Sequence, residues 1–162
     1  MLKLKKVFAK LTLALALTAG VSFAASQVPS AGQPVQAASK KTERNKVVSL
    51  AKKQVGKRYV WGATGPYSFD CSGLTSFVYS KAIKKNITRT TYTQVKKGKT
   101  VKVSTRKLQK GDLLFWGSKR SPYHVGIYIG GGKYVHAATP SQGVRKQSLS
   151  RYFWPSTAKR II

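Results

Sequence analysis

The chain has 162 residues, about the size of one ordinary domain, and 31 lysines and arginines against 3 acidic residues give it a formal net charge of +28. Such a charge concentrates polyanions at the surface, but the basic residues are scattered and match no nucleic-acid-binding module, so we expect a generally solvated basic surface and no nucleic acid partner. The single cysteine excludes a disulfide within the chain.

The beginning of the chain has the pattern of a secretory signal peptide. A lysine-bearing start is followed by the apolar segment 11–21, which is too short to span a bilayer comfortably, and then by small residues. We favour cleavage after Ala37, which assigns 1–37 to the signal peptide, with Ala24 or Ala25 as the alternative. An uncleaved N-terminal anchor is the competing interpretation. A signal peptide makes the membrane a partner only during export.

The remainder predicts helices first and strands afterwards. Residues 38–44 are expected to be a linker and 45–162 a folded domain, although Thr42 has the side chain to cap a first helix. A second helix is expected from Asp70 onward, and irregular structure over 82–100. Helices followed by an antiparallel meander are typical of the α+β class. The strands are expected around 100–103, 112–116, 123–129, 133–138 and 144–147.

Cys71 is the first candidate for chemistry. Exported proteins normally use cysteine in pairs, so a lone thiol is either a buried structural residue or a reactive group. Asp70 is predicted to be the N-cap of the second helix, which places Cys71 at the first helical position. There the positive end of the helix dipole, together with a nearby imidazolium, is expected to lower the pKa of the thiol.

The two histidines of the chain are predicted to share one face of a β-hairpin. Three glycines, 130–132, separate two segments of alternating polar and apolar residues. A three-residue loop pairs Ile129 with Lys133 and leaves both histidines, His124 and His136, on one face. A two-residue loop would put them on opposite faces.

A cysteine and two histidines indicate nucleophilic catalysis, with His124 as the base and His136 orienting it. The alternative of a metal site lacks the third protein ligand that a catalytic zinc requires. A purely structural role is the other alternative, chiefly for His136.

Five segments of the chain, in this order, resemble the NlpC/P60 cysteine peptidases. They are residues 59–62, 69–75, 108–113, 124–130 and 135–137. The resemblance runs from about Lys46 to the end of the chain. It implies a papain-like α+β fold in which helices pack on an antiparallel sheet and a catalytic cysteine begins a helix, with no metal and no cofactor.

The resemblance also implies an activity, the hydrolysis of peptidoglycan stem peptides, usually between γ-D-glutamyl and a diamino acid. Carried over by position, Cys71 is the nucleophile, His124 the general base and His136 the orienting residue. An amidase or an acyltransferase on the same fold, and a non-catalytic cationic wall-binding protein, are the alternatives. The residues implied to bind substrate are Tyr59, Trp61, Asp70 and Ser72.

The implied location is outside the cell, at a wall of the Gram-positive type, where anionic polymers are the expected partners of the basic surface. Ala63 stands where the family commonly has glycine, and the neighbouring segment 64–67 is unusual in composition. Both border the expected cleft, so these departures concern substrate preference rather than catalysis.

Overall fold

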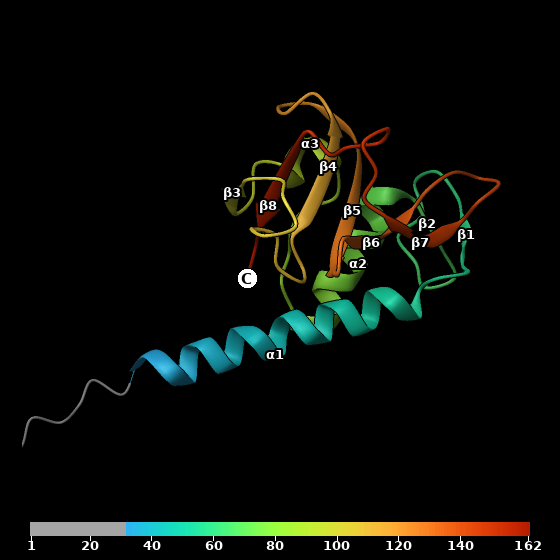
Figure 1. Ribbon diagram of the computed structural model, residues 1–162. Helices are drawn as coiled ribbons and strands as arrows, with labels where there is room; N and C mark the ends of the chain where they lie inside the picture. Colours follow the sequence, from blue (N-terminus) through green and yellow to red (C-terminus); the bar gives the residue numbers. More distant parts are fainter. Residues whose placement is uncertain (1–31) are drawn as a thin grey trace, which may run out of the picture. The chain divides into compact units, whose positions relative to one another are not determined.

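The computed structural model describes residues 32–162, so most of the predicted signal peptide, residues 1–31, lies outside the described residues. None of the helices in the described part is long and apolar enough to cross a membrane. The helices are α1 (Gly32–Lys53), α2 (Cys71–Ile83) and α3 (Thr91–Gln94) (Figure 1). The strands are β1 (Arg58–Tyr59), β2 (Ser68–Phe69), β3 (Lys99–Val101), β4 (Leu113–Gly117), β5 (Pro122–Gly130), β6 (Lys133–Ala137), β7 (Val144–Ser148) and β8 (Thr157–Arg160).

Six of the strands form one antiparallel sheet in the order β3-β8-β4-β5-β6-β7, and β1 pairs with β2 in parallel. Strands β4 to β7 are the meander that the sequence predicts, and the α+β class is confirmed. Strand β8 was not predicted, because Thr157–Arg160 shows no clear apolar alternation. It enters the sheet between β3 and β4, which lie far from it in the sequence.

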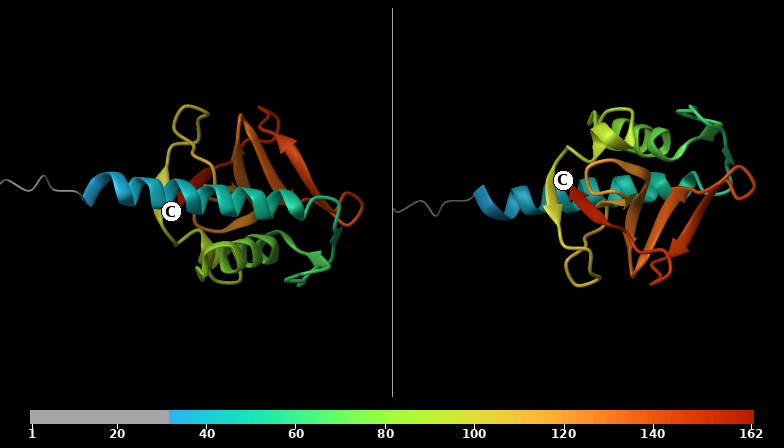
Figure 2. Two further views of the ribbon diagram at one scale, coloured as in Figure 1. Left: turned by 90° about the horizontal axis from the view of Figure 1, so that it is seen from below. Right: turned by 90° about the horizontal axis from the view of Figure 1, so that it is seen from above.

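Helices α1 and α2 pack beside each other and contact the same sheet, chiefly at β5 and β6 (Figure 1, Figure 2). Their apolar side chains and one face of the sheet form the main core, which is fully buried at Val47, Leu74 and Val125. A second, smaller core on the other face gathers around Trp116 and Tyr134. Each face of the sheet is therefore covered, which fixes the register of its strands.

Helix α1 begins earlier than the sequence predicts. Thr42 does not cap it: the Thr42 hydroxyl donates to the carbonyl oxygen of Ala38, 3.0 Å away and one turn back in the same helix. The predicted linker 38–44 is helical, because residues 35–44 contain no proline or glycine that would end a helix.

The β5–β6 hairpin differs from the prediction at its tip. Tyr128 pairs with Tyr134 as expected, but Lys133 pairs with Gly130 and not with Ile129. The turn therefore consists of two residues, and the prediction of a three-residue loop is wrong.

A bulge nevertheless keeps the two histidines on one face. The turn glycines Gly131 and Gly132 have φ angles of 60° and 68°, the positive values that tight two-residue hairpin turns require. The register shifts between Tyr128 and Gly130, so one extra residue is taken up in β5 and the alternation of side chains is restored. The predicted juxtaposition of the histidines thus arises from a shorter turn combined with a bulge.

Candidate active site

Asp70 is the N-cap of α2, as the sequence predicts. Its backbone is extended, with φ −91° and ψ 178°, and its Oδ1 accepts the N–H of Gly73 at 2.6 Å. Its Oδ2 accepts the N–H of Gly62 at 2.9 Å. One buried carboxylate therefore joins the start of α2 to the loop that follows β1.

Gly73 lets this loop approach the helix. The backbone oxygen of Ala63 accepts the N–H of Asp70 at 2.9 Å. A Cβ atom on Gly73 would lie 2.1 Å from that oxygen, so glycine is required for close backbone contact at this position.

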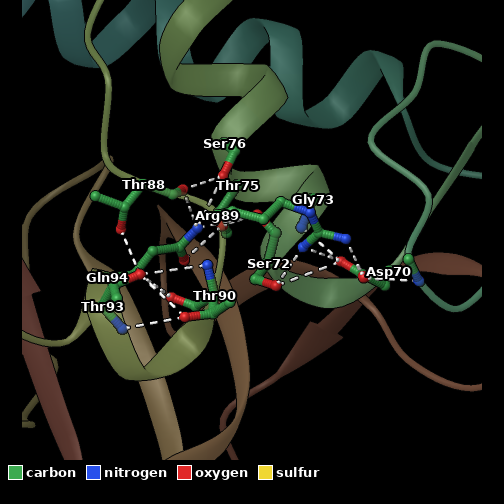
Figure 3. Close-up of polar contacts among 11 residues, drawn as sticks. Asp70, Ser72, Gly73, Thr75, Ser76, Thr88, Arg89, Thr90, Thr93 and Gln94 are labelled. Atoms are coloured by element: carbon green, nitrogen blue, oxygen red, sulfur yellow. Dashed lines mark hydrogen bonds and ion pairs between the residues drawn. The ribbon is translucent and has the colours of Figure 1, made fainter.

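Arg89 completes the surroundings of Asp70. Its guanidinium forms an ion pair with the carboxylate, through Nη2 to Oδ2 and through Nη1 to Oδ1 at 3.1 Å. Nη1 also donates to the hydroxyl of Ser72 at 2.8 Å, so the guanidinium lies between Asp70 and Ser72 (Figure 3). Sequence reasoning assigned no role to Arg89, because its partner lies 19 residues away in the chain.

Gln94 fixes the segment that carries Arg89 against α2 (Figure 3). Its buried amide nitrogen donates to the carbonyl oxygens of Ser72 at 3.0 Å and Thr88 at 3.1 Å, and its amide oxygen accepts the Thr75 hydroxyl at 2.8 Å. The short helix α3 thus forms within the segment predicted to be irregular and is anchored by buried hydrogen bonds.

Cys71 is the first residue of α2 and is only 8% exposed. The backbone N–H groups of Val125, Ser72 and Cys71 itself are near enough to the sulfur to favour its ionised form. Val125 lies on β5 and directly follows His124, and α2 packs against this strand. Burial raises the pKa of the Tyr59 hydroxyl, and the proximity of Cys71 and Asp70 raises it further.

The histidines form a hydrogen-bonded chain that ends at Gln147. Nε2 of His124 lies 2.7 Å from Nδ1 of His136, and Nε2 of His136 lies 3.1 Å from Oε1 of Gln147. An amide oxygen only accepts, so Nε2 of His136 donates to it and Nδ1 of the same neutral ring is an acceptor. His124 therefore donates through Nε2, which leaves its Nδ1 without a proton and able to accept one.

Burial keeps both imidazoles neutral. It lowers the pKa of His124 to about 3, with a further contribution from His136, and it lowers the pKa of His136 to about 4 against the opposing hydrogen bond to Gln147. The indole of Trp116 contributes to this burial, with ring centroids 5.4 Å from His124 and 6.4 Å from His136.

The expected lowering of the thiol pKa is contradicted. Burial raises the pKa of the Cys71 thiol, the neighbouring charge of Asp70 raises it further, and the backbone N–H groups around the sulfur lower it by less. The neutral His124 supplies no positive charge. At rest the thiol is therefore protonated and both imidazoles are neutral.

Two cavities flank this group of residues. The first, of about 590 Å³, is lined by residues that include Trp61, Asp70, Ser72 and Arg89. The second, of about 570 Å³, is lined by both histidines together with the 138–142 loop and part of β7. Tyr123, which is 65% exposed, borders both cavities.

Trp61, Asp70 and Ser72 line the first cavity and both histidines line the second, while Cys71 begins the helix that packs against β5. Asp70 and Ser72 are buried, Tyr59 is partly buried, and Trp61 is 85% exposed at the edge of the first cavity. Within residues 32–162 no three side chains of the types that bind metals gather in a potential site. Sequence reasoning missed Gln147, because a polar residue on an edge strand gives no signal of its partner.

Comparison with known proteins gives a consistent result. A sequence model of the NlpC/P60 family matches residues 56–162. Protein P54 of Enterococcus faecium is 42% identical over 106 residues, which are 65% of this chain and 20% of that protein. A probable endopeptidase of Corynebacterium glutamicum is 42% identical over 114 residues, or 70% of this chain and 52% of that protein. The chain thus spans about half the length of these relatives or less.

Solved structures share the fold. The NlpC/p60 domain of the peptidoglycan hydrolase SagA superposes with a TM-score of 0.67 at 40% identity, covering 72% of this chain and 97% of that domain. The peptidoglycan hydrolase RipB of Mycobacterium tuberculosis superposes with a TM-score of 0.67 at 25% identity, covering 77% of this chain and 67% of that structure.

The raised pKa of Cys71 predicts slow alkylation of the free protein. The thiolate is the reacting form, so the rate of reaction with iodoacetamide should rise with pH at a midpoint above the value of about 8.5 for a free thiol. The rate is measured by mass spectrometry, with the urea-unfolded chain as the control. A midpoint below that of the unfolded chain would contradict the electrostatics described above.

Proposed function

This chain belongs to the NlpC/P60 family, and we propose that it is a cysteine-type endopeptidase that hydrolyses the stem peptides of peptidoglycan. The observation that carries the proposal is the hydrogen-bonded chain from Gln147 through His136 to His124, which leaves Nδ1 of His124 free to accept a proton on the strand that adjoins Cys71. The names of its relatives, endopeptidase and peptidoglycan hydrolase, support the same class of reaction.

In the first step of the proposed mechanism, Sγ of Cys71 attacks the carbonyl carbon of the peptide bond while its proton moves to Nδ1 of His124. Because the thiol is protonated at rest, attack and proton transfer are coupled. The backbone N–H groups of Cys71 and Ser72, which are near the sulfur and lower its pKa, are the proposed donors to the developing oxyanion.

The second half of the reaction uses the same groups in reverse. The carbon–nitrogen bond breaks, and the leaving amine takes the proton from His124, which leaves a thioester on Cys71. Water then attacks the thioester while His124 accepts a proton from it, and the departing sulfur recovers that proton. His136 orients His124 throughout, and no cofactor is needed for these steps.

We propose the bond between γ-D-glutamyl and the diamino acid as the one cleaved. In this proposal the first cavity receives the amino end of the stem peptide, with Ser72 and Asp70 as its polar contacts. The Tyr59 hydroxyl lies near the Cys71 thiol, and Trp61 forms a wall of the cavity. An incoming ammonium group would share the Asp70 carboxylate with Arg89.

Digestion of defined muropeptides tests the activity and the bond. Wild-type protein should release a fragment with the diamino acid at its new amino end, identified by mass, and Cys71→Ala should lower the rate by about 10³-fold or more. Ser80→Ala, an exposed change on the same helix, is the matched control and should leave the rate unchanged.

Other outcomes would support the competing interpretations. Cleavage between the sugar and the first amino acid would indicate an amidase, and an amine-linked product would indicate an acyltransferase. Wall remodelling by Cys71→Ala at the wild-type rate would favour a non-catalytic wall-binding protein.

Gln147 is predicted to be a positioning residue. Gln147→Leu removes the acceptor that fixes the proton on His136, so kcat should fall about five- to tenfold while KM stays unchanged. Gln147→Glu should retain kcat, because a carboxylate also accepts, and should raise the pKa of His136 so that the acid limb of the rate profile moves to higher pH.

Steady-state kinetics of the two Gln147 variants distinguish this role from a structural one. Ser148→Ala, the next residue on the same strand and exposed, is the control. If Gln147→Glu lost as much activity as Gln147→Leu, with no shift in the rate profile, the positioning role would be refuted.

We further propose that residues 1–37 form a signal peptide, that 45–162 form the catalytic domain, and that the protein acts outside the cell at a wall of the Gram-positive type. The basic surface would then hold the enzyme to anionic wall polymers. Residues 1–37 contain four of the 31 basic residues, so the remaining chain has 27 basic and 3 acidic residues and a formal net charge of +24, which supports the proposal. The attraction should extend over roughly one Debye length, about 10 Å at 0.1 M salt.

Binding of Cys71→Ala to isolated cell walls should therefore weaken when the salt concentration is raised from about 0.05 M to about 0.5 M. The bound fraction is measured by sedimentation, with walls stripped of their anionic polymers as the control. Binding that is independent of salt would contradict an electrostatic attachment.

A further inference from the structure

The second cavity contains a cationic side chain that the mechanism above does not use. Arg145 on β7 lines this cavity of about 570 Å³ together with His124, His136, Thr139 and Gln142. In the sheet Arg145 is the register partner of His136, so the two side chains project from the same face. The positive charge of Arg145 also contributes to lowering the pKa of His136.

No carboxylate neutralises Arg145. The chain has only three acidic residues. Asp70 is paired with Arg89 and Asp112 with Arg160, while Glu43 lies on α1 and is not among the residues that line the cavity. The second cavity therefore contains one permanent cation and no acidic side chain, whereas in the first cavity the charge of Arg89 is balanced by Asp70.

The chemistry of the reaction indicates which part of the substrate enters the second cavity. The leaving amine must receive its proton from His124, and His124 lines the second cavity but not the first. The fragment that carries the amine therefore occupies the second cavity. A peptide fragment released in this way ends in a carboxylate, and a diamino acid within it carries another when it has a second carboxyl group.

We propose that Arg145 binds a carboxylate of the leaving fragment, and that this contact selects stem peptides in which that carboxylate is free. The inference rests on the function proposed above. A guanidinium presents paired N–H donors that match the two oxygens of a carboxylate. The hydroxyl of Thr139 and the amide of Gln142 provide further donors in the same cavity.

Paired substrates test the proposal. Each pair contains the same γ-D-glutamyl–diamino acid bond, and one carboxylate of the leaving fragment is either free or converted to an amide. In the pair that varies the carboxylate contacted by Arg145, the kcat/KM of the wild-type protein should be at least about tenfold higher for the free acid than for the amide. Arg145→Gln should lower kcat/KM for the free acid to the level of the amide and leave the amide unaffected.

Lys146→Gln is the matched control. Lys146 is the adjacent cationic residue on β7 and lies outside the second cavity, in a groove with Lys52 and Lys133. It should retain the wild-type preference. Arg145→Lys keeps the charge without the paired donors and should show an intermediate preference.

A binding measurement tests the role of Arg145 independently of hydrolysis. Calorimetry with Cys71→Ala should show tighter binding of the free-acid leaving fragment than of its amide, and adding Arg145→Gln should abolish the difference. If the wild-type protein cleaved no substrate, the proposed function would fail, yet this binding difference would still decide the role of Arg145.

Three results would overturn the assignment of Arg145. One is equal loss of activity on the acid and the amide in Arg145→Gln, and another is the absence of any preference in wild-type kinetics and binding. The third is a loss of cell-wall binding in Arg145→Gln without a change toward soluble substrates, which would assign Arg145 to the basic surface that contacts polymers.

Discussion

The carboxylate of Asp70 is the interaction on which the arrangement of the site depends. It accepts hydrogen bonds from the first turn of α2 and from the loop at Gly62, and it forms the ion pair with Arg89. Three segments that are separate in the sequence therefore meet at one buried group. An N-cap is ordinarily worth about 1 kcal/mol to a helix. Here the cap also fixes the walls of the first cavity and the position of Cys71, so its structural role exceeds that of an isolated helix end.

The other half of the site depends on neutral hydrogen bonds. His124, His136 and Gln147 come from three neighbouring strands, β5, β6 and β7. Each pairs with the next through a polar contact whose direction is set by the amide oxygen at the end of the chain. A carboxylate in the place of Gln147 would favour a charged imidazole. The amide instead fixes the position of the proton without adding charge to a buried region.

The sequence was sufficient for the features that arise from local chemistry. Asp70 as a helix cap, Cys71 at the helix start and the alternation around the histidines follow from rules that act over a few residues. The pairing of Arg89 with Asp70 and of His136 with Gln147 depends on how distant segments pack, which no local pattern reports. The pKa of Cys71 was predicted in the wrong direction for the same reason. The helix dipole is visible in the sequence, whereas burial and the absence of an imidazolium become evident only in the folded chain.

The protonated thiol has a consequence for the lifetime of the protein. Oxidation of cysteine to sulfenic acid and beyond proceeds through the thiolate and requires access to the sulfur. Cys71 is buried and its pKa is raised. Peroxides and other oxidants should therefore react slowly with it while no substrate is bound. With no second cysteine in the chain, an oxidised sulfur could not be rescued by an internal disulfide. The burial that makes the resting nucleophile weak thus also preserves it chemically between turnovers.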